Sequence, residues 1–379
     1  MPQIKKSALH FLIFGLVILC SVKIAQGQPT GWQGKTENME GVEYIYNPEQ
    51  GLWEHESKPA LKIKRIFSIG KASNKAEKNL GWVQDIATDS AGNIYICDSR
   101  KNQIVIYDRK GKFIRAIGGS RKGAAQLRRP SQVTIGPNGF LFVLDALNYR
   151  IAIFDASGNF VKSLGYNGYA GGFAVDSNGN VLLTFARLRE GYERPLPNVT
   201  VLDDSGKMIW EFGEPIVVIK QDYYGQKRFA WNGLAVRDYS TLLVSFSYPY
   251  MIHFYKGAML QKAVFRESPI FTKPELVGRE GPGLVMQRSY IWDLLVLPHG
   301  KIAAFIRDAG QNYAQPTSDR EFETHVDLFD ADGYFLASYP WDWRKLGLIK
   351  HVDREGYFYS NFGETEIVPG VTKYRVEFN

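Results

Sequence analysis

Five polar residues stand at or near the starts of apolar segments along the chain, and their side chains could bind a ligand or a metal. They are Gln84, Asp85, Gln132, Asn232 and Asp293. Carboxylate and amide oxygens are the hard donors that calcium prefers. Water can satisfy the same side chains in an ordinary polar channel. The sequence therefore leaves two interpretations open, a polar cavity without a cofactor or a calcium site at Asp85, Gln132, Asn232 and Asp293.

Other catalytic arrangements are missing from the sequence. The chain has six histidines, and no two of them stand at the spacing of a zinc motif. It has no Gly-x-Ser-x-Gly motif and no glycine-rich phosphate loop beside a helix. His351, which we expect to follow the first strand of the last repeating unit, has no visible partner, and we interpret it as a structural histidine. Catalytic residues therefore stay unknown, and a protein without enzymatic activity is the favoured interpretation.

Two series of turns give the chain a repeating organisation. In the first series an Asp opens a turn that contains Gly, as at residues 108–113, 155–160, 203–208 and 330–335. The second series lies upstream, at residues 89–92, 137–139, 176–179, 298–300 and 353–356. An Asp side chain accepts hydrogen bonds from backbone N–H groups of a turn, and Gly supplies the positive φ. Each unit is therefore predicted to contain four antiparallel strands, joined by one turn of each series.

Six such units are predicted, beginning near Trp82, Ser131, Gly171, Trp231, Ile291 and Leu348. This repeat indicates an all-β fold, a six-bladed β-propeller over residues 61–379. The sixth unit ends after its third strand, and residues 62–70 resemble the fourth strands of earlier units. We expect this N-terminal strand to close the ring and to remove an open sheet edge. We expect residues 28–60 to lie across the outside of the ring and to be dispensable.

Two units resemble a known repeat. Residues 82–106, with Asp85-Ile86-Ala87 and Cys97-Asp98, resemble an NHL repeat, and the next unit is similar, with Leu144-Asp145. The chain as a whole resembles exported bacterial six-bladed propellers. The resemblance implies that the first strand of each blade lines a central channel, where related lactonases hold calcium. The five polar residues near the strand starts would then face this channel, together with Gly172 and Ile349.

The connections opposite the short turns are long, and they form the expected long-loop face. Insertions on one face of a repeat fold commonly mark the binding face. Arg, Tyr and Trp, which are enriched at recognition surfaces, are frequent there. The candidate ligand-binding residues are Arg187, Arg189, Tyr192, Tyr223, Tyr224, Arg228, Trp231, Trp292, Arg307 and Tyr313.

The first 27 residues are predicted to be a signal peptide. Lys5 and Lys6 precede an apolar run, and Ala25-Gln26-Gly27 supplies small residues for cleavage. Cleavage removes three lysines and lowers the formal net charge from +7 to +4. We therefore expect a secreted or periplasmic chain that binds no nucleic acid, with a membrane-anchored form only if Cys20 carries a lipid. Cys97 is then the single remaining cysteine, and we interpret it as a buried apolar residue.

Three functions are compatible with this sequence. The favoured one is a monomeric binding module that presents its long-loop face to a protein, peptide or glycan. The second is a calcium-dependent enzyme of the lactonase or lyase kind, with the metal in the central channel. The third is a structural component of a cell-envelope complex.

Overall fold

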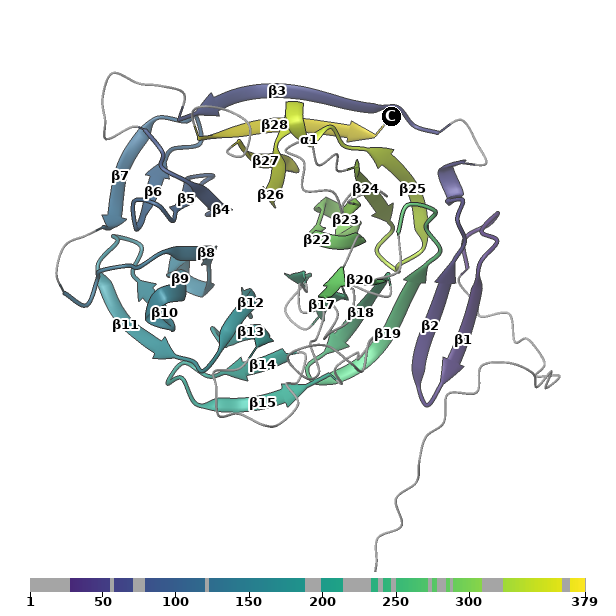
Figure 1. The fold of residues 1–379 in the computed structure, drawn as a ribbon, viewed down its shortest axis with the longest axis horizontal. Helices are drawn as coiled ribbons and strands as arrows, with labels where there is room; N and C mark the ends of the chain where they lie inside the picture. Colours follow the sequence, from purple (N-terminus) through teal and green to yellow (C-terminus); the bar gives the residue numbers. More distant parts are fainter. Residues whose placement is uncertain are drawn as a thin grey trace, which may run out of the picture.

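The computed structural model describes residues 28–54, 58–70, 79–119, 123–187, 199–213, 233–237, 241–246, 250–271, 275–277, 284–286, 289–308, 323–362 and 369–378. In these residues the strands form six blades around a central axis (Figure 1). The prediction of an all-β six-bladed propeller with four-stranded antiparallel blades is confirmed.

Each blade runs from an inner strand near the axis to an outer strand at the rim. Blade 1 contains β4 (Val83–Thr88), β5 (Ile94–Asp98), β6 (Gln103–Tyr107) and β7 (Phe113–Gly118). Blade 2 contains β8 (Pro130–Ile135), β9 (Leu141–Asp145), β10 (Arg150–Phe154) and β11 (Phe160–Gly165). Blade 3 contains β12 (Tyr169–Val175), β13 (Val181–Arg187), β14 (Val199–Leu202) and β15 (Met208–Phe212).

The second half of the ring repeats this order. Blade 4 contains β16 (Leu234–Val236), β17 (Thr241–Phe246), β18 (Met251–Lys256) and β19 (Met259–Arg266). Blade 5 contains β22 (Ser289–Val296), β23 (Ile302–Asp308), β24 (Glu323–Phe329) and β25 (Phe335–Pro340). Blade 6 contains β26 (Leu348–Val352), β27 (Tyr357–Phe362), β28 (Gly370–Phe378) and β3 (Leu61–Ile69).

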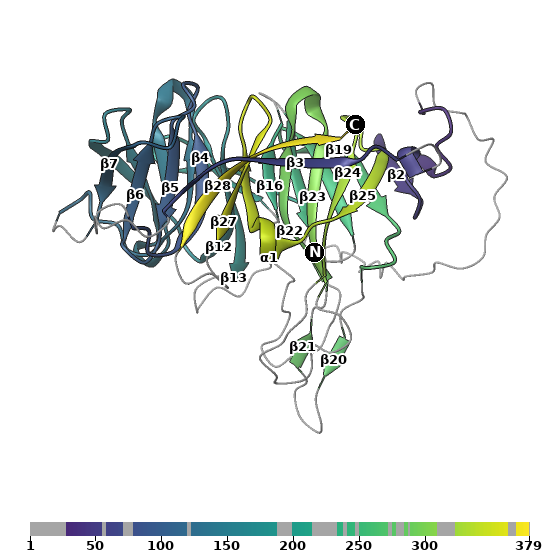
Figure 2. The same ribbon diagram turned by 90° about the horizontal axis from the view of Figure 1, so that it is seen from above.

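Short elements lie within the blades, between them and before them. The helical ones are η1 (Leu52–Glu54), η3 (Pro137–Gly139), η4 (Ala146–Asn148), η5 (Pro298–Gly300) and α1 (Trp343–Leu346). A hairpin of β1 (Lys35–Met39) and β2 (Val42–Asn47) precedes the ring. A second hairpin, β20 (Glu275–Val277) and β21 (Leu284–Met286), projects from the long-loop face (Figure 2). The sequence predicted only a long loop there.

The Asp-Gly turns have the predicted chemistry. Asp155 Oδ1 accepts a hydrogen bond from the Asn159 backbone N–H at 2.8 Å, and Gly158 has a φ of +84°. The turns at Asp108, Asp203 and Asp330 repeat this pattern. These hydrogen bonds fix the geometry of the turn. Each copy of the motif therefore sets the register between the strand before the turn and the strand after it.

A second set of aspartates anchors the opposite face. Asp98 ends β5 and accepts hydrogen bonds from the backbone N–H groups of Gly81 and Trp82. Asp145 ends β9 in the same way and accepts one from the backbone N–H of Arg128. Both carboxylates are fully buried. Each one fixes the loop that leads into its own blade, which explains the Asp that the two NHL-like units share.

The apolar core consists of clusters arranged around the ring rather than one central cluster. Six buried clusters occur among the described residues, and each one joins two neighbouring blades. Cys97 lies in the cluster between blades 1 and 2 and is fully buried, which confirms its interpretation as an apolar residue. Burial raises the pKa of its thiol. Because every blade packs on two others, each inner strand has a fixed position around the axis.

Blade 6 contains segments from both ends of the chain. Strand β3 lies antiparallel to β28, with Ile69 opposite Val371 and Leu61 opposite Phe378 (Figure 1). Ser68 Oγ and Thr372 Oγ1 share a hydrogen bond of 2.8 Å across this pair. Residues more than 300 positions apart therefore occupy one sheet.

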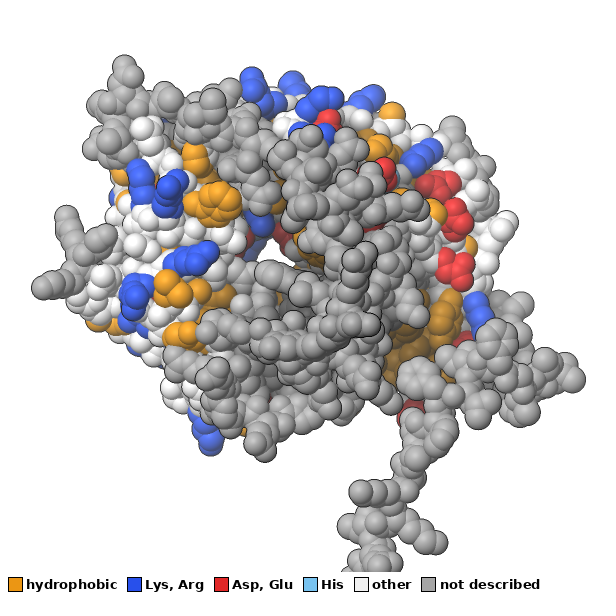
Figure 3. All heavy atoms as spheres, in the orientation of Figure 1, with side chains coloured by type: hydrophobic (Ala, Val, Ile, Leu, Met, Phe, Trp, Pro, Cys, Tyr) orange, Lys and Arg blue, Asp and Glu red, His pale blue; other side chains and the backbone are white. Residues whose placement is uncertain are grey.

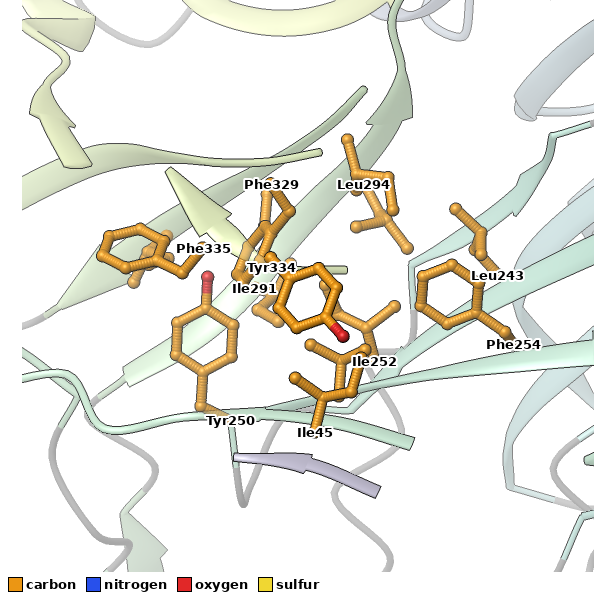
Figure 4. Close-up of a cluster of buried hydrophobic side chains, with 14 residues drawn as sticks. Ile45, Leu243, Tyr250, Ile252, Phe254, Ile291, Leu294, Phe329, Tyr334 and Phe335 are labelled. Carbon is orange, nitrogen blue, oxygen red and sulfur yellow. The ribbon is translucent and has the colours of Figure 1, made fainter. Parts of the chain in front are cut away.

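The N-terminal hairpin adds two strands to blade 4. Strand β2 pairs in parallel with β19, the outer strand of that blade. Ile45 of β2 is fully buried and lies among side chains from blades 4 and 5, such as Ile252 and Tyr334 (Figure 4). The hairpin therefore completes the core between these blades.

Asn47, at the end of β2, joins the hairpin to both blades. Its Nδ2 donates to the carbonyl oxygens of Gly333 at 2.9 Å and Phe265 at 3.2 Å. Its Oδ1 accepts from the backbone N–H of Phe335 at 2.8 Å. The side chain is buried. These contacts argue against the sequence-based expectation that residues 28–60 are dispensable, because their removal would expose core and leave buried backbone groups without partners.

We predict that Asn47→Ala lowers the free energy of unfolding by about 2–3 kcal/mol, because it leaves buried backbone donors and acceptors unsatisfied. The measurement is the urea midpoint of the purified protein. Asn38→Ala, on the exposed strand of the same hairpin, is the control and should change stability by about 0.5 kcal/mol or less. Equal midpoints for the two variants would contradict the role of Asn47.

Candidate ligand-binding channel

The inner strands share a local distortion that builds the channel wall. Five of the described inner strands contain a register shift at the same place. The shifts lie at Val83/Asp85, Pro130/Gln132, Ala170/Gly172, Ile291/Asp293 and Ile349/His351. A β-bulge of this kind re-aims a side chain and is frequent beside functional sites.

The bulges surround a cavity of about 1460 Å³ at the centre of the ring. Its opening is visible near the middle of Figure 3. Polar side chains line it on blades 5, 6, 1 and 2. Glycines line it on blades 3 and 4, at Gly171, Gly172 and Gly233. The polar bulge residues are Gln84, Asp85, Ser131, Gln132, Asp293, Lys350 and His351. At the level of the bulges the channel therefore has polar side chains on one half and glycines on the other, which leaves room for a ligand on the glycine side.

Two carboxyl groups in the channel have raised pKa values. Loss of solvent raises the pKa of Asp85 to about 7, although the backbone N–H of Val133, 2.9 Å from Oδ2, and the Lys350 charge oppose the shift. The same loss raises the pKa of Asp293 to about 6, and Lys350 again opposes it. Near neutral pH the channel therefore holds a carboxyl group that is close to half protonated, a carboxylate and an ammonium group.

His351 adds a neutral imidazole to this group. Burial lowers its pKa to about 4, so the ring is uncharged at neutral pH. Its Nε2 lies 2.8 Å from Thr88 Oγ1 of the neighbouring blade. This contact fixes the ring between blades 6 and 1.

Two buried polar atoms in the channel wall have no hydrogen-bond partner among the described residues. They are Gln132 Oε1 and Trp292 Nε1, one acceptor and one donor. Both residues line the cavity. The Trp292 ring is parallel to Phe305, with 6.1 Å between the centroids, which holds the indole in place. Unsatisfied buried polar atoms are costly, so these two are available to a ligand.

The structure brings three of the four proposed metal ligands together. Asp85, Gln132 and Asp293 occupy the same position in the bulges of blades 1, 2 and 5. Asn232 lies outside the described residues. Calcium takes six to eight oxygen ligands, and in the described chain no group of three His, Cys, Asp or Glu is close enough to hold a metal. Lys350 acts on both carboxyl groups, and the calcium site stays a prediction.

Sequence reasoning missed Lys350 and misplaced His351. It assigned Ile349 to the channel, but the bulge shifts the register by one, and Lys350 and His351 line the cavity instead. His351 lies within β26 rather than after it. A polar residue followed by an apolar one, as in Asp85-Ile86 and Asp293-Leu294, was the signal that could have identified His351.

Two of the ten candidate residues of the long-loop face have described side chains. Trp292 lines the channel. Arg307 lies on β23, and its Nη1 donates to Tyr290 Oη at 3.3 Å. Arg187 ends β13, with its backbone alone described. The remaining seven lie outside the described residues: Arg189, Tyr192, Tyr223, Tyr224, Arg228, Trp231 and Tyr313.

Comparison with known proteins agrees with this architecture. Residues 76–185 match a family model described as a 6-bladed beta-propeller. The chain is a six-bladed β-propeller that resembles NHL-repeat proteins. It is 33% identical over 79 residues to the RING finger protein nhl-1 of Caenorhabditis elegans. This match covers 21% of the chain and spans 7% of the length of that relative.

Solved structures of similar fold come from Bacteroides. A member of the duf4221 family from Bacteroides vulgatus has a TM-score of 0.57 at 10% identity, over 85% of this chain and 100% of that one. A putative exported protein from Bacteroides fragilis has a TM-score of 0.59 at 11% identity, over 88% of this chain and 99% of that one. At these identities the likeness shows the fold alone. Within the described part of the propeller, no helix has the length and apolarity needed to cross a membrane.

We predict a pH-dependent stability that depends on Asp85. Its pKa rises from about 3.9 in the unfolded chain to about 7 in the folded one, so the folded state holds a proton that the unfolded state releases. The resulting contribution to the free energy of unfolding is complete below about pH 4 and is lost as the pH rises through 7. Asp85→Asn should therefore gain stability over the wild type between pH 4 and 8, by up to about 4 kcal/mol.

Urea midpoints across this pH range measure the effect. Asp108→Asn is a control of opposite sign, because backbone N–H groups lower the pKa of Asp108. This variant should be less stable than the wild type at neutral pH, and the difference should shrink as the pH falls below about 4. Parallel stability curves for Asp85→Asn and the wild type would show that Asp85 is not desolvated.

Proposed function

We propose that this propeller is a binding module that receives a polar ligand, a peptide or a glycan, through its long-loop face and holds part of it in the central channel. The observation that carries the proposal is the divided channel. One half presents polar side chains with two unsatisfied atoms, and the other half presents glycines. A concave site with a few fixed polar groups is the usual form of a small-ligand site.

The channel residues are well positioned for recognition. They stand on the inner strands, which the clusters between blades hold in place. Asp85 and the neutral His351 can exchange donor and acceptor roles, whereas Lys350 donates only. Such a set suits hydroxyl, amide and carboxylate groups. Rigid elements hold a binding site more accurately than loops do.

The long-loop face would bring the ligand to the channel. The β20–β21 hairpin projects from this face and adds a wall beside the ring (Figure 2). The opposite face consists of the short Asp-Gly turns. An extended ligand would thus find contact area on the long-loop face alone.

A metal-dependent hydrolase or lyase is the second candidate. It is favoured by the equivalent positions of Asp85, Gln132 and Asp293 in three bulges. The calcium content of the purified chain separates the two proposals. Calcium that binds the wild type but not Asp85→Asn or Asp293→Asn would favour the enzyme.

We also propose that the chain is exported. The support is the sequence pattern of residues 1–27 and the fold shared with a protein from Bacteroides fragilis that is described as putatively exported. A lipid on Cys20 would place the chain at a membrane surface. Mass spectrometry of the mature N-terminus, expected at or near Gln28, decides between these forms.

Random-peptide display and a glycan panel, screened with the mature chain, should yield a preferred ligand class. Gln132→Met removes the side-chain amide and Trp292→Phe removes the indole N–H. Each variant should raise the Kd about 3- to 10-fold, because each leaves a ligand group unpaired. Ser157→Ala, on the exposed turn face, is the control. Binding that Ser157→Ala weakens as much as Gln132→Met would contradict the channel site.

A further inference from the structure

A patch of exposed cationic and apolar side chains lies on the long-loop face of blades 1 and 2, beside the channel opening. We call Trp82, Arg100, Arg128, Arg129 and Leu147 the blade 1–2 patch. Trp82 is 38% exposed and Leu147 is 44% exposed. The three arginines are exposed as well. Figure 3 shows Lys and Arg side chains among hydrophobic ones over this side of the ring.

The patch is continuous along the backbone of both blades. The backbone beside Trp82 lies close to Arg100. A Cβ added to Gly81, the residue before Trp82, would lie 3.0 Å from the Cβ of Arg100. The Arg129 N–H donates to Asn102 Oδ1 at 2.7 Å, and the Leu147 N–H donates to the Arg128 carbonyl oxygen at 3.2 Å. These contacts place the residues in one row across the two blades.

The row also reaches the channel. Trp82 Nε1 donates to Gln84 Oε1 at 2.9 Å, and Gln84 lines the cavity. The buried carboxylates of Asp98 and Asp145 fix the loops at Trp82 and Arg128. A ligand held in the channel could therefore extend along the row without any change in the backbone.

The exposed charged side chains of this patch are all positive. On this face of blades 1 and 2 the described carboxylates are Asp98 and Asp145, and both are fully buried and bound to backbone N–H groups. The guanidinium groups of Arg100, Arg128 and Arg129 thus meet no exposed described carboxylate there. Arg129 also has a φ of +50° before Pro130. A non-glycine residue held in this conformation is frequent at functional sites.

We propose that the blade 1–2 patch binds an acidic polypeptide segment of a partner protein, in which carboxylates alternate with apolar side chains. The planar guanidinium group matches a carboxylate through two parallel hydrogen bonds. Trp and Arg are the residue types that contribute most at protein interfaces. Trp82 and Leu147 favour a polypeptide over a polysaccharide, because they offer contact to an apolar side chain. This inference rests on the proposed binding function and names its partner.

The experiment measures the binding of a fluorescent peptide of alternating Glu and Leu to the mature chain by anisotropy, over a range of salt concentrations. Arg100→Glu and Arg128→Glu should each raise the Kd about 10-fold or more, because each places a repelling carboxylate against the peptide. Leu147→Ser should raise it about 3- to 10-fold. Lys110→Glu makes the same change of charge on the turn face and should alter the Kd less than twofold. Unchanged melting temperatures show that the variants are folded.

Three outcomes would overturn the inference. In the first, polyglutamate and the Glu–Leu peptide bind equally and the Leu147→Ser variant binds as tightly as the wild type. This result would indicate charge attraction alone. Another is tighter binding of polygalacturonate than of the peptide. The third is loss of affinity in Gln132→Met but not in Arg100→Glu, which leaves the channel function standing without this partner. Ligands from the display screens that bind all of these variants equally would reject the proposed function itself.

Discussion

The pairing of β3 with β28 is the contact on which the arrangement of the ring depends. It joins residues from the two ends of the chain in one sheet, and Ile69 of β3 enters the buried cluster that connects blade 6 to blade 1. Without β3, the long strand β28 would leave a row of backbone groups unpaired at a sheet edge. The four strands around the axis in each of the other five blades come from one continuous stretch of sequence, so we expect the ring to close at this pair.

A closed ring is also what gives the channel its chemistry. The clusters between blades fix the angle and height of every inner strand, and the shared bulges then direct Asp85, Gln132, Asp293 and His351 to one level around the axis. Burial at this level raises the pKa values of Asp85 and Asp293 and lowers that of His351. The same interior would be an unstructured set of polar residues if the blades could move apart.

The repeat made the fold predictable, because an Asp and a Gly at fixed spacing encode a turn by local hydrogen bonds alone. Asp85, Gln132 and Asp293 could be found for the same reason, since they recur with the blades. Lys350 could not be found in this way, because a bulge moves the register by one residue and the local sequence contains no pattern that predicts the bulge. The role of Asn47 was hidden too, since its partner Gly333 is 286 residues away and no repeat relates the two.

The thermal unfolding of two variants of β3 tests the closure most directly. Ile69 is 5% exposed and Ile66, on the same strand, is 43% exposed. Ile69→Ala should cost about 2–4 kcal/mol and lower the melting temperature of the whole ring, with circular dichroism and tryptophan fluorescence following one transition. Ile66→Ala should melt close to the wild type. Equal melting temperatures for the two variants, or a separate early transition in Ile69→Ala while the rest of the ring keeps its wild-type melting temperature, would contradict closure through β3.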